Sequence, residues 1–309
     1  MAQSTQNSNT WKIIVIASLG YFVDIYDLLL FQIVKKESLA DLGVTDAAQL
    51  FSLETNLFNF QMIGMLLGGI IWGILGDKRG RIQVLFGSIL LYSLANIANA
   101  FVVETFQYGL CRFFSGLGLA GELGAGITLV VETMSKEKRG YGTMIIVTFG
   151  ALGAVAASLV GKNIGPALAE FFNLNLHGWQ MTYIIGGVLG LLLLILRAGA
   201  YESGMFDKIK TQNEVSKGDF FMLFQNKKIF GKYLKCILVG LPIWYVVGVL
   251  IAFAEKFSLF MGMNEKIEIG TCVLYTYIGL SFGDLLSGLF SQWFSNRRKI
   301  IMTRPLQNN

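Results

Sequence analysis

The sequence predicts an all-α protein that crosses a membrane several times, and three observations support this prediction. Of its 309 residues, 54% are hydrophobic and only 15% are charged, whereas soluble domains carry about 25% charged residues. The mean hydropathy is +0.58. Apolar runs of roughly 20 residues recur along the whole chain, and each is long enough to cross a bilayer as a helix. This composition argues against a water-soluble enzyme, and we expect no enzymatic activity.

Eight apolar runs are predicted as membrane helices. In chain order they are Trp11–Val34, Leu53–Gly76, Ile82–Val103, Phe106–Val131, Gly142–Gly161, Met181–Ala198, Tyr233–Ala254 and Ile269–Trp293. A lysine-rich polar stretch too long for a hairpin separates the first six from the last two. The predicted units are an N-terminal six-helix bundle (1–200), a cytoplasmic inter-domain loop (201–232), a partial C-terminal bundle of two helices (233–299) and a polar tail (300–309).

The distribution of lysine and arginine predicts the orientation. With the N-terminus in the cytoplasm, 19 of the 25 basic residues fall on the cytoplasmic side and five outside, including Arg197 inside and Lys35 outside. This asymmetry follows the positive-inside rule and predicts a cytoplasmic N-terminus; we expect a multi-pass protein of the plasma (inner) membrane. It also accounts for the net charge of +5, so binding of nucleic acid is not needed to explain that charge.

The cysteines and the single histidine do not suggest a metal or disulfide site. Cys111, Cys236 and Cys272 lie in separate apolar runs without CxxC spacing, and His177 has no ligand-type neighbour in sequence. We expect no metal and no cofactor.

The connection between the second and third helices carries a specific motif, GILGDKRGR (residues 73–81). It resembles the loop signature G-x-x-x-D-[RK]-x-G-[RK] of the major facilitator superfamily. Farther along, Glu132 followed by Arg139 resembles the Glu…Arg-Gly pair of sugar porters and metabolite symporters in that superfamily. The resemblance implies a conformational latch made by Gly73, Asp77, Lys78, Gly80, Arg81, Glu132 and Arg139. The alternative is that these are ordinary charges at the lipid headgroups.

A degenerate copy of the motif, GLFSQWFSNRRK, follows the eighth helix (residues 288–299). Two copies at corresponding places imply parallel six-helix halves. The resemblance therefore implies a major facilitator fold with a complete six-helix N-terminal half plus the first two helices of the C-terminal half. Because a polar tail follows, we expect a product truncated after the eighth helix. A full-length form would be monomeric.

The first helix contains two acids, Asp24 and Asp27, spaced to share one face. Carboxylates at membrane depth are costly and are functional candidates by default. The stretch resembles the first helix of metabolite:proton symporters and of phosphate:proton symporters. This resemblance implies a proton-coupling role, for Asp27 first and Asp24 second. The alternative is ion pairing with a neighbouring helix for packing.

The fourth helix supplies an acid and a base. Glu122 lies at mid-span in a Gly-Glu-Leu-Gly context that resembles metabolite:proton symporters, and is a third proton-coupling candidate. Arg112 lies ten residues earlier and could pair with Asp27 or contact an anionic solute, or else snorkel to the interface. Gly116, Ala120 and Gly124 form a small-residue ridge that favours close helix packing.

Three residues of the C-terminal helices are further candidates for solute binding. Asp284 is an acid inside the eighth helix, and Trp244 and Tyr245 follow Pro242 in the seventh. Helix breaks in transporters often border the solute cavity, although aromatic residues in membrane helices more often serve packing.

The sequence thus predicts a secondary active transporter that takes up a small solute together with a proton, driven by the proton gradient. Its expected partners are the solute, the proton and the lipid bilayer. Organic acid, sugar acid, sugar and phosphate all remain open as solutes. The alternatives are a truncated, non-transporting membrane protein that serves as a sensor or assembly partner, and a channel, which the lack of a pore loop disfavours.

Overall fold

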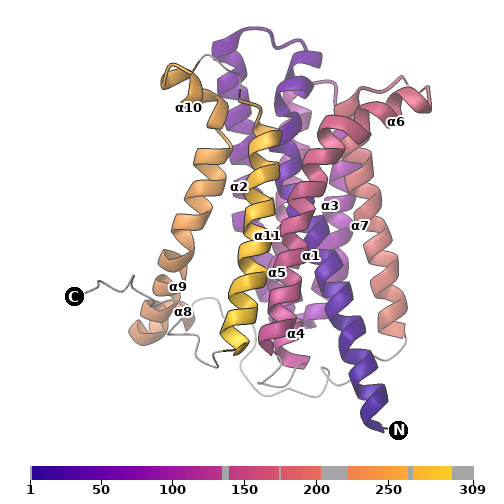
Figure 1. Ribbon diagram of the computed structural model, residues 1–309, viewed down its shortest axis with the longest axis vertical. Helices are drawn as coiled ribbons and strands as arrows, with labels where there is room; N and C mark the ends of the chain where they lie inside the picture. The colour runs from indigo at the N-terminus through magenta and orange to yellow at the C-terminus, as the bar shows by residue number, and fades with distance from the viewer. Residues whose placement is uncertain (1, 134–138, 174, 203–221, 264–266, 294–309) are drawn as a thin grey trace.

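The computed structural model describes residues 2–133, 139–173, 175–202, 222–263 and 267–293, and within these ranges the chain forms helices and short connections without strands. Six of the described helical segments are long and apolar enough to cross a membrane. The helices lie side by side, with α6 and α10 at one end of the bundle and the N-terminus at the other (Figure 1). We call the first end the α10 end.

The first half of the chain supplies six long helical segments. They are α1 (Ala2–Asp41), α2 (Ala47–Arg79), α3 (Arg81–Asn99), α4 (Thr105–Thr133), α5 (Arg139–Leu159) continued by the π-helix η1 (Val160–Ile164) and by α6 (Gly165–Phe171), and α7 (Gly178–Glu202). This arrangement confirms the first six predicted helices. Most of them extend beyond the apolar runs, because polar residues continue the backbone hydrogen bonding past the hydrocarbon core.

The second half supplies the two remaining predicted helices. Its elements are α8 (Met222–Gln225), α9 (Lys227–Tyr245) continued by the π-helix η3 (Val246–Ile251), α10 (Ala254–Phe260) and α11 (Ile269–Trp293). The bounds of α11 agree with the prediction. Helix α9 begins ahead of the predicted apolar run at Tyr233, because Asn226 caps the helix by accepting hydrogen bonds from the backbone N–H groups of Lys228 (3.0 Å) and Ile229 (3.4 Å).

Helix α1 lies at the centre of the first half. It packs against α5, α4 and α7, while α2 packs on α4, and α3 packs on both α4 and α7. The two halves are joined chiefly by α5, which packs along α11. Helix α9 contributes no buried residue between its bounds and stands apart from the bundle in Figure 1. In the second half, buried side chains are therefore contributed by η3, α10 and α11 and not by α9.

Close approach between helices depends on glycine at several contacts. A Cβ added at Gly64 or Gly68 of α2 would overlap the α4 backbone at Phe113 or Leu117, and one at Gly116 would overlap the α2 backbone at Gln61. The predicted packing role of Gly116 is thereby confirmed. These contacts bring α4 and its charged residues close to α2.

Replacing Gly68 with alanine should destabilise the fold by about 1–3 kcal/mol, because the new methyl group meets backbone rather than a movable side chain. Gly69→Ala is the matched control, since no atom lies within 4 Å of a Cβ at that position. Thermal unfolding of the purified variants in detergent checks this. Equal stability of the two variants would contradict the close α2–α4 contact.

Candidate functional site

Two carboxylates of α1 lie inside the bundle. Asp24 and Asp27 are both 0% exposed, and their spacing of three residues places them on one face of the helix. Ser115 of α4 donates a hydrogen bond to Asp27 Oδ2 at 2.7 Å. Arg112 Nη2 lies 3.5 Å from Asp27 Oδ1, so the structure brings together the acid and the base that the sequence suggested as partners.

The guanidinium of Arg112 is enclosed by α1, α4 and α7. It is fully buried, which does not fit a snorkelling residue. Its Nη2 donates to Ser115 Oγ at 2.8 Å and its Nη1 to the Tyr183 hydroxyl at 3.2 Å. The rings of Phe31 and Tyr183 lie 5.7 and 5.4 Å from its central carbon, within cation–π range. Arg112 is thus held by aromatic faces as well as by hydrogen bonds.

A second buried ion pair joins Glu122 of α4 to Arg197 of α7. Both guanidinium Nη atoms donate to the carboxylate, one to each oxygen, and both residues are at most 5% exposed. The sequence analysis counts Arg197 among the cytoplasmic basic residues, and the structure shows that its side chain is buried. Helix α7 continues to Glu202, so Arg197 remains inside the helix, and its carboxylate partner outweighs the attraction of water. The sequence signal for this burial was that Arg197 lies within the predicted sixth membrane helix.

Asp24 lies among these charges without a direct partner. Its charged neighbours are Glu122, Arg197 and Asp27, but neither carboxylate oxygen of Asp24 has a hydrogen-bond partner within the described part of the chain. We call Asp24, Asp27, Arg112, Glu122 and Arg197 the charge cluster. It contains three carboxylates and two guanidinium groups, so one carboxylate lacks a cationic counterpart within the cluster.

The other predicted solute-binding residues lie outside the charge cluster. Asp284 of α11 is partly exposed. Tyr21 of α1 lies near enough to interact electrostatically with both Asp284 and Asp24. Trp244 and Tyr245, the last two residues of α9, are 49% and 53% exposed. Among the described residues, no group of three histidine, cysteine, aspartate or glutamate side chains could hold a metal ion.

The latch residues are only partly described. Asp77 and Lys78 are exposed at the end of α2. Gly73 has open space around it, and Gly80 joins α2 to α3 with φ of 94°, a backbone conformation that favours glycine. This explains why the signature requires glycine at the position of Gly80. The side chains of Arg81, Glu132 and Arg139 lie outside the described residues, so the latch stays a prediction.

The α10 end contains a buried lysine of α1 that is counted above among the five outer basic residues. The Lys35 side chain is 3% exposed and its Nζ lies 3.7 Å from Glu54 Oε2 of α2. Nζ also donates to Gln32 Oε1 at 3.0 Å and to the backbone oxygen of Ala252 at 3.1 Å. Ala252 follows η3, so this lysine joins the two halves of the chain.

Further polar contacts join the halves at the same end. Lys36 pairs with Glu255 of α10 at 2.6 Å, and Ser158 of α5 donates to the backbone oxygen of Gly270 at 2.6 Å. Lys162 donates a hydrogen bond to Glu268, which lowers the pKa of that exposed carboxyl group. In the described conformation, these contacts hold α1 and α5 to the second half at the α10 end.

The fold defines an α-helical, multi-pass membrane protein with a buried ionic centre. The family described as Major Facilitator Superfamily matches residues 17–307, and the chain belongs to this family. The named relatives are transport proteins.

Three relatives illustrate the similarity in sequence. The sialic acid transporter NanX of Escherichia coli is 26% identical over 90% of this chain and 64% of its own. The niacin transporter NiaP of Acinetobacter baylyi is 28% identical over 60% of this chain and 39% of its own. The cis,cis-muconate transport protein of the same bacterium is 25% identical over 96% of this chain and 70% of its own. The chain thus spans less than two thirds of the first two relatives.

Two solved structures share the fold. The proton:xylose symporter XylE bound to 6-bromo-6-deoxy-D-glucose matches with a TM-score of 0.59 and 15% identity, covering 97% of this chain and 70% of that one. A bacterial homologue of the human lysosomal transporter Spinster, inward-facing and unoccupied, matches with a TM-score of 0.62 and 16% identity, covering 93% and 63%. These matches confirm the predicted major facilitator fold.

Replacing Lys35 with methionine should destabilise the protein by about 3–5 kcal/mol, because Glu54 would be left buried without its cation. Lys36→Met is the matched control: the Lys36 side chain is 54% exposed, and surface pairs contribute about 0–1 kcal/mol. Unfolding in detergent measures both.

The double variant Lys35→Met/Glu54→Met should recover much of the loss, because it removes both buried charges together. A double variant that is as unstable as Lys35→Met alone would contradict the pairing.

Proposed function

We propose that the chain forms a secondary active transporter that takes up a small organic anion together with a proton. Membership of the Major Facilitator Superfamily and the relatives named as transport proteins support the transport class. The buried charge cluster supports proton coupling. The proton gradient across the membrane supplies the energy, and no other cofactor takes part.

The single observation that carries the proposal is the unequal number of charges in the cluster. Arg112 holds Asp27 and Arg197 holds Glu122, whereas Asp24 is fully buried without a donor among the described residues. An isolated carboxylate is costly in a medium of low dielectric constant, so it binds a proton there. One bound proton makes the cluster neutral.

This arrangement favours Asp24 as the proton carrier in the described conformation. Asp27 and Glu122 each have a guanidinium that stabilises the charged form, and Asp24 has none of its own. When the cluster is charged and no solute is bound, the change between outward and inward conformations is disfavoured. When the cluster is neutral and solute is bound, the change is permitted. Uptake then follows the proton gradient.

The relatives favour a carboxylate as the solute. Sialic acid, niacin, benzoate and cis,cis-muconate occur in their names, and each carries a carboxyl group. Arg112 offers a suitable group, since its Nε has no hydrogen-bond partner within the described residues. Asp284, Trp244 and Tyr245 remain candidates for contact with the solute. Sugar and phosphate are the other solute classes to test.

The distribution of basic residues supports an orientation for the protein. We place the protein in the plasma membrane with the N-terminus in the cytoplasm, so that the α10 end faces outward. The contacts of Lys35, Lys36 and Lys162 then close the outer side of the protein in the described conformation. The motif between α2 and α3 lies at the cytoplasmic side, where its predicted latch role applies to the outward-open state.

Uptake into proteoliposomes tests the proposal, with labelled sialic acid, niacin, benzoate and cis,cis-muconate as probes and sugars and phosphate as further probes. A gradient of one pH unit, about 1.4 kcal/mol, allows up to about tenfold accumulation when one proton accompanies each solute. Asp24→Asn should lose this accumulation and keep solute exchange, because asparagine resembles the neutral acid.

Glu104→Gln provides the control, because Glu104 is exposed in the connection between α3 and α4. Accumulation by Asp24→Asn equal to that of the wild type would reject Asp24 as the proton carrier. A folded wild type that takes up none of the probes would favour the alternative of a non-transporting membrane protein.

A further inference from the structure

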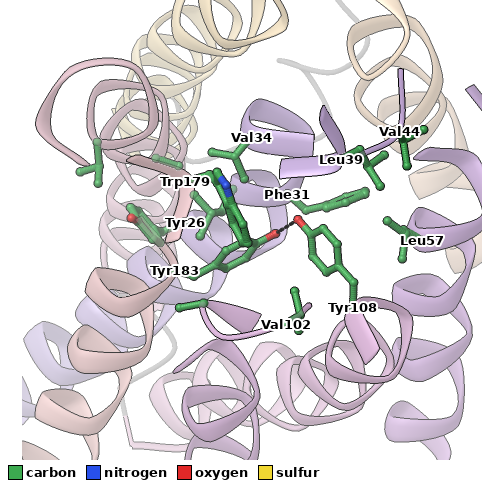
Figure 2. Packing of buried hydrophobic residues seen from close by; sticks show 14 residues of the cluster. Tyr26, Phe31, Val34, Leu39, Val44, Leu57, Val102, Tyr108, Trp179 and Tyr183 are labelled. Carbon is green, nitrogen blue, oxygen red and sulfur yellow. Dashed lines mark hydrogen bonds between the residues drawn. The ribbon is translucent and has the colours of Figure 1, made fainter. Parts of the chain in front are cut away.

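A chain of hydroxyl groups extends from Arg112 toward the α10 end. The Tyr183 hydroxyl of α7 lies 3.2 Å from Arg112 Nη1 and 2.7 Å from the Tyr108 hydroxyl of α4. The Tyr108 hydroxyl lies 3.0 Å from Ser38 Oγ of α1, which donates to the backbone oxygen of Lys35 at 3.0 Å. Figure 2 shows the Tyr183–Tyr108 hydrogen bond inside the aromatic core. The charge cluster is thus connected to the turn of α1 that carries Lys35.

The two ends of this chain fix the direction of its hydrogen bonds. A guanidinium has donors and no acceptor, so the Tyr183 hydroxyl accepts from Arg112. Ser38 donates its only hydroxyl proton to the backbone oxygen of Lys35, so Tyr108 donates to Ser38 and Tyr183 donates to Tyr108. On its other side Arg112 donates to Ser115, which donates to Asp27. The chain cannot conduct protons through Arg112, but it holds the guanidinium in one orientation.

The surrounding rings keep these hydroxyl groups in place. Tyr108 and Tyr183 are fully buried and pack edge to face with centroids 6.1 Å apart. Trp179 packs on both rings, and Phe31 packs on Tyr108, as Figure 2 shows. A tyrosine-to-phenylalanine change therefore removes one hydroxyl group and leaves the aromatic packing.

The Asp27–Arg112 contact is looser than the Glu122–Arg197 contact. Arg112 Nη2 remains 3.5 Å from Asp27 Oδ1, and that oxygen accepts no hydrogen bond from the described residues. Arg197 instead reaches both oxygens of Glu122. The two pairs differ in that Nη1 of Arg112 donates to the Tyr183 hydroxyl and not to the carboxylate.

We propose that Tyr183, supported by Tyr108 and Ser38, is a positioning residue that holds Arg112 back from a two-armed ion pair with Asp27. This inference rests on the proposed proton-coupled function. The Asp27–Arg112 pair then stays loose enough to open during transport. The charge cluster, in turn, keeps its bound proton near neutral pH. Without the Tyr183 hydroxyl, Arg112 swings to Asp27 Oδ1 and stabilises the charged state of the cluster.

The charged groups that act on Asp27 are the same in all the tyrosine-to-phenylalanine variants of the test. The charged and titratable groups around it are Asp24 and Tyr26 on α1, Tyr92 on α3, Arg112 on α4 and Tyr183 on α7. Tyrosines are neutral near neutral pH, so loss of the Tyr183 hydroxyl changes hydrogen bonding and removes no charge.

Infrared difference spectra of the purified, solute-free protein, recorded across a pH series, test the positioning role. The carbonyl band of protonated buried carboxyl groups is assigned to the charge cluster by its loss in Asp24→Asn or Asp27→Asn. In Tyr183→Phe the midpoint of this band should move to lower pH by about one unit, the size expected for one hydrogen bond to a charged group. Tyr108→Phe should give a smaller shift in the same direction.

Tyr26→Phe is the matched control. Tyr26 is equally buried in the same aromatic core, but its hydroxyl donates to the backbone oxygen of Thr182 at 3.1 Å and does not contact Arg112. Its midpoint should equal that of the wild type. A midpoint that Tyr183→Phe leaves unchanged, or that Tyr26→Phe shifts equally, overturns the positioning role alone. A band that neither Asp24→Asn nor Asp27→Asn removes overturns the proposed proton site as well.

Discussion

The structure depends on the cost of placing charge where water is absent. A membrane-spanning chain satisfies its backbone by forming helices, but a buried side-chain charge must find its counterpart on another helix. Two such pairs, Asp27–Arg112 and Glu122–Arg197, tie α4 to α1 and to α7. The charged centre therefore fixes which faces of three helices turn toward one another.

Glycine contacts and the ionic contacts at the α10 end complete this arrangement. Backbone contacts at Gly64, Gly68 and Gly116 bring α2 against α4, so the arginine of α4 sits deep in the bundle. At the α10 end Lys35 binds both Glu54 and the second half of the chain. Between these places the hydroxyl groups of Tyr183 and Tyr108 provide a continuous path. The charge cluster and the contact between the halves are thus joined by a continuous chain of hydrogen bonds that ends on α1.

Much of the fold and part of the site could be predicted from local properties of the sequence. Run length and hydropathy located eight helices, since a span requires about 20 apolar residues. The cost of intramembrane charge identified Asp24, Asp27, Glu122 and Arg112, all of which are buried in the structure. The loop motif indicated the family that residues 17–307 match. Hydropathy did not locate the first residue of α9, because the helix begins beside Asn226 in a polar stretch ahead of the apolar run.

The sequence by itself determined the helices, their class and the presence of surplus acid in the membrane, because these depend on local composition and spacing. Only the tertiary structure decided the partners. Arg197 and Glu122 are 75 residues apart, Tyr108 and Tyr183 also 75, and Lys35 and Ala252 are 217 apart, whereas helical spacing relates residues only three or four positions apart. Counting basic residues by side of the membrane cannot distinguish buried from exposed ones. Lys35 and Arg197 are buried because packed helices supply each with a carboxylate.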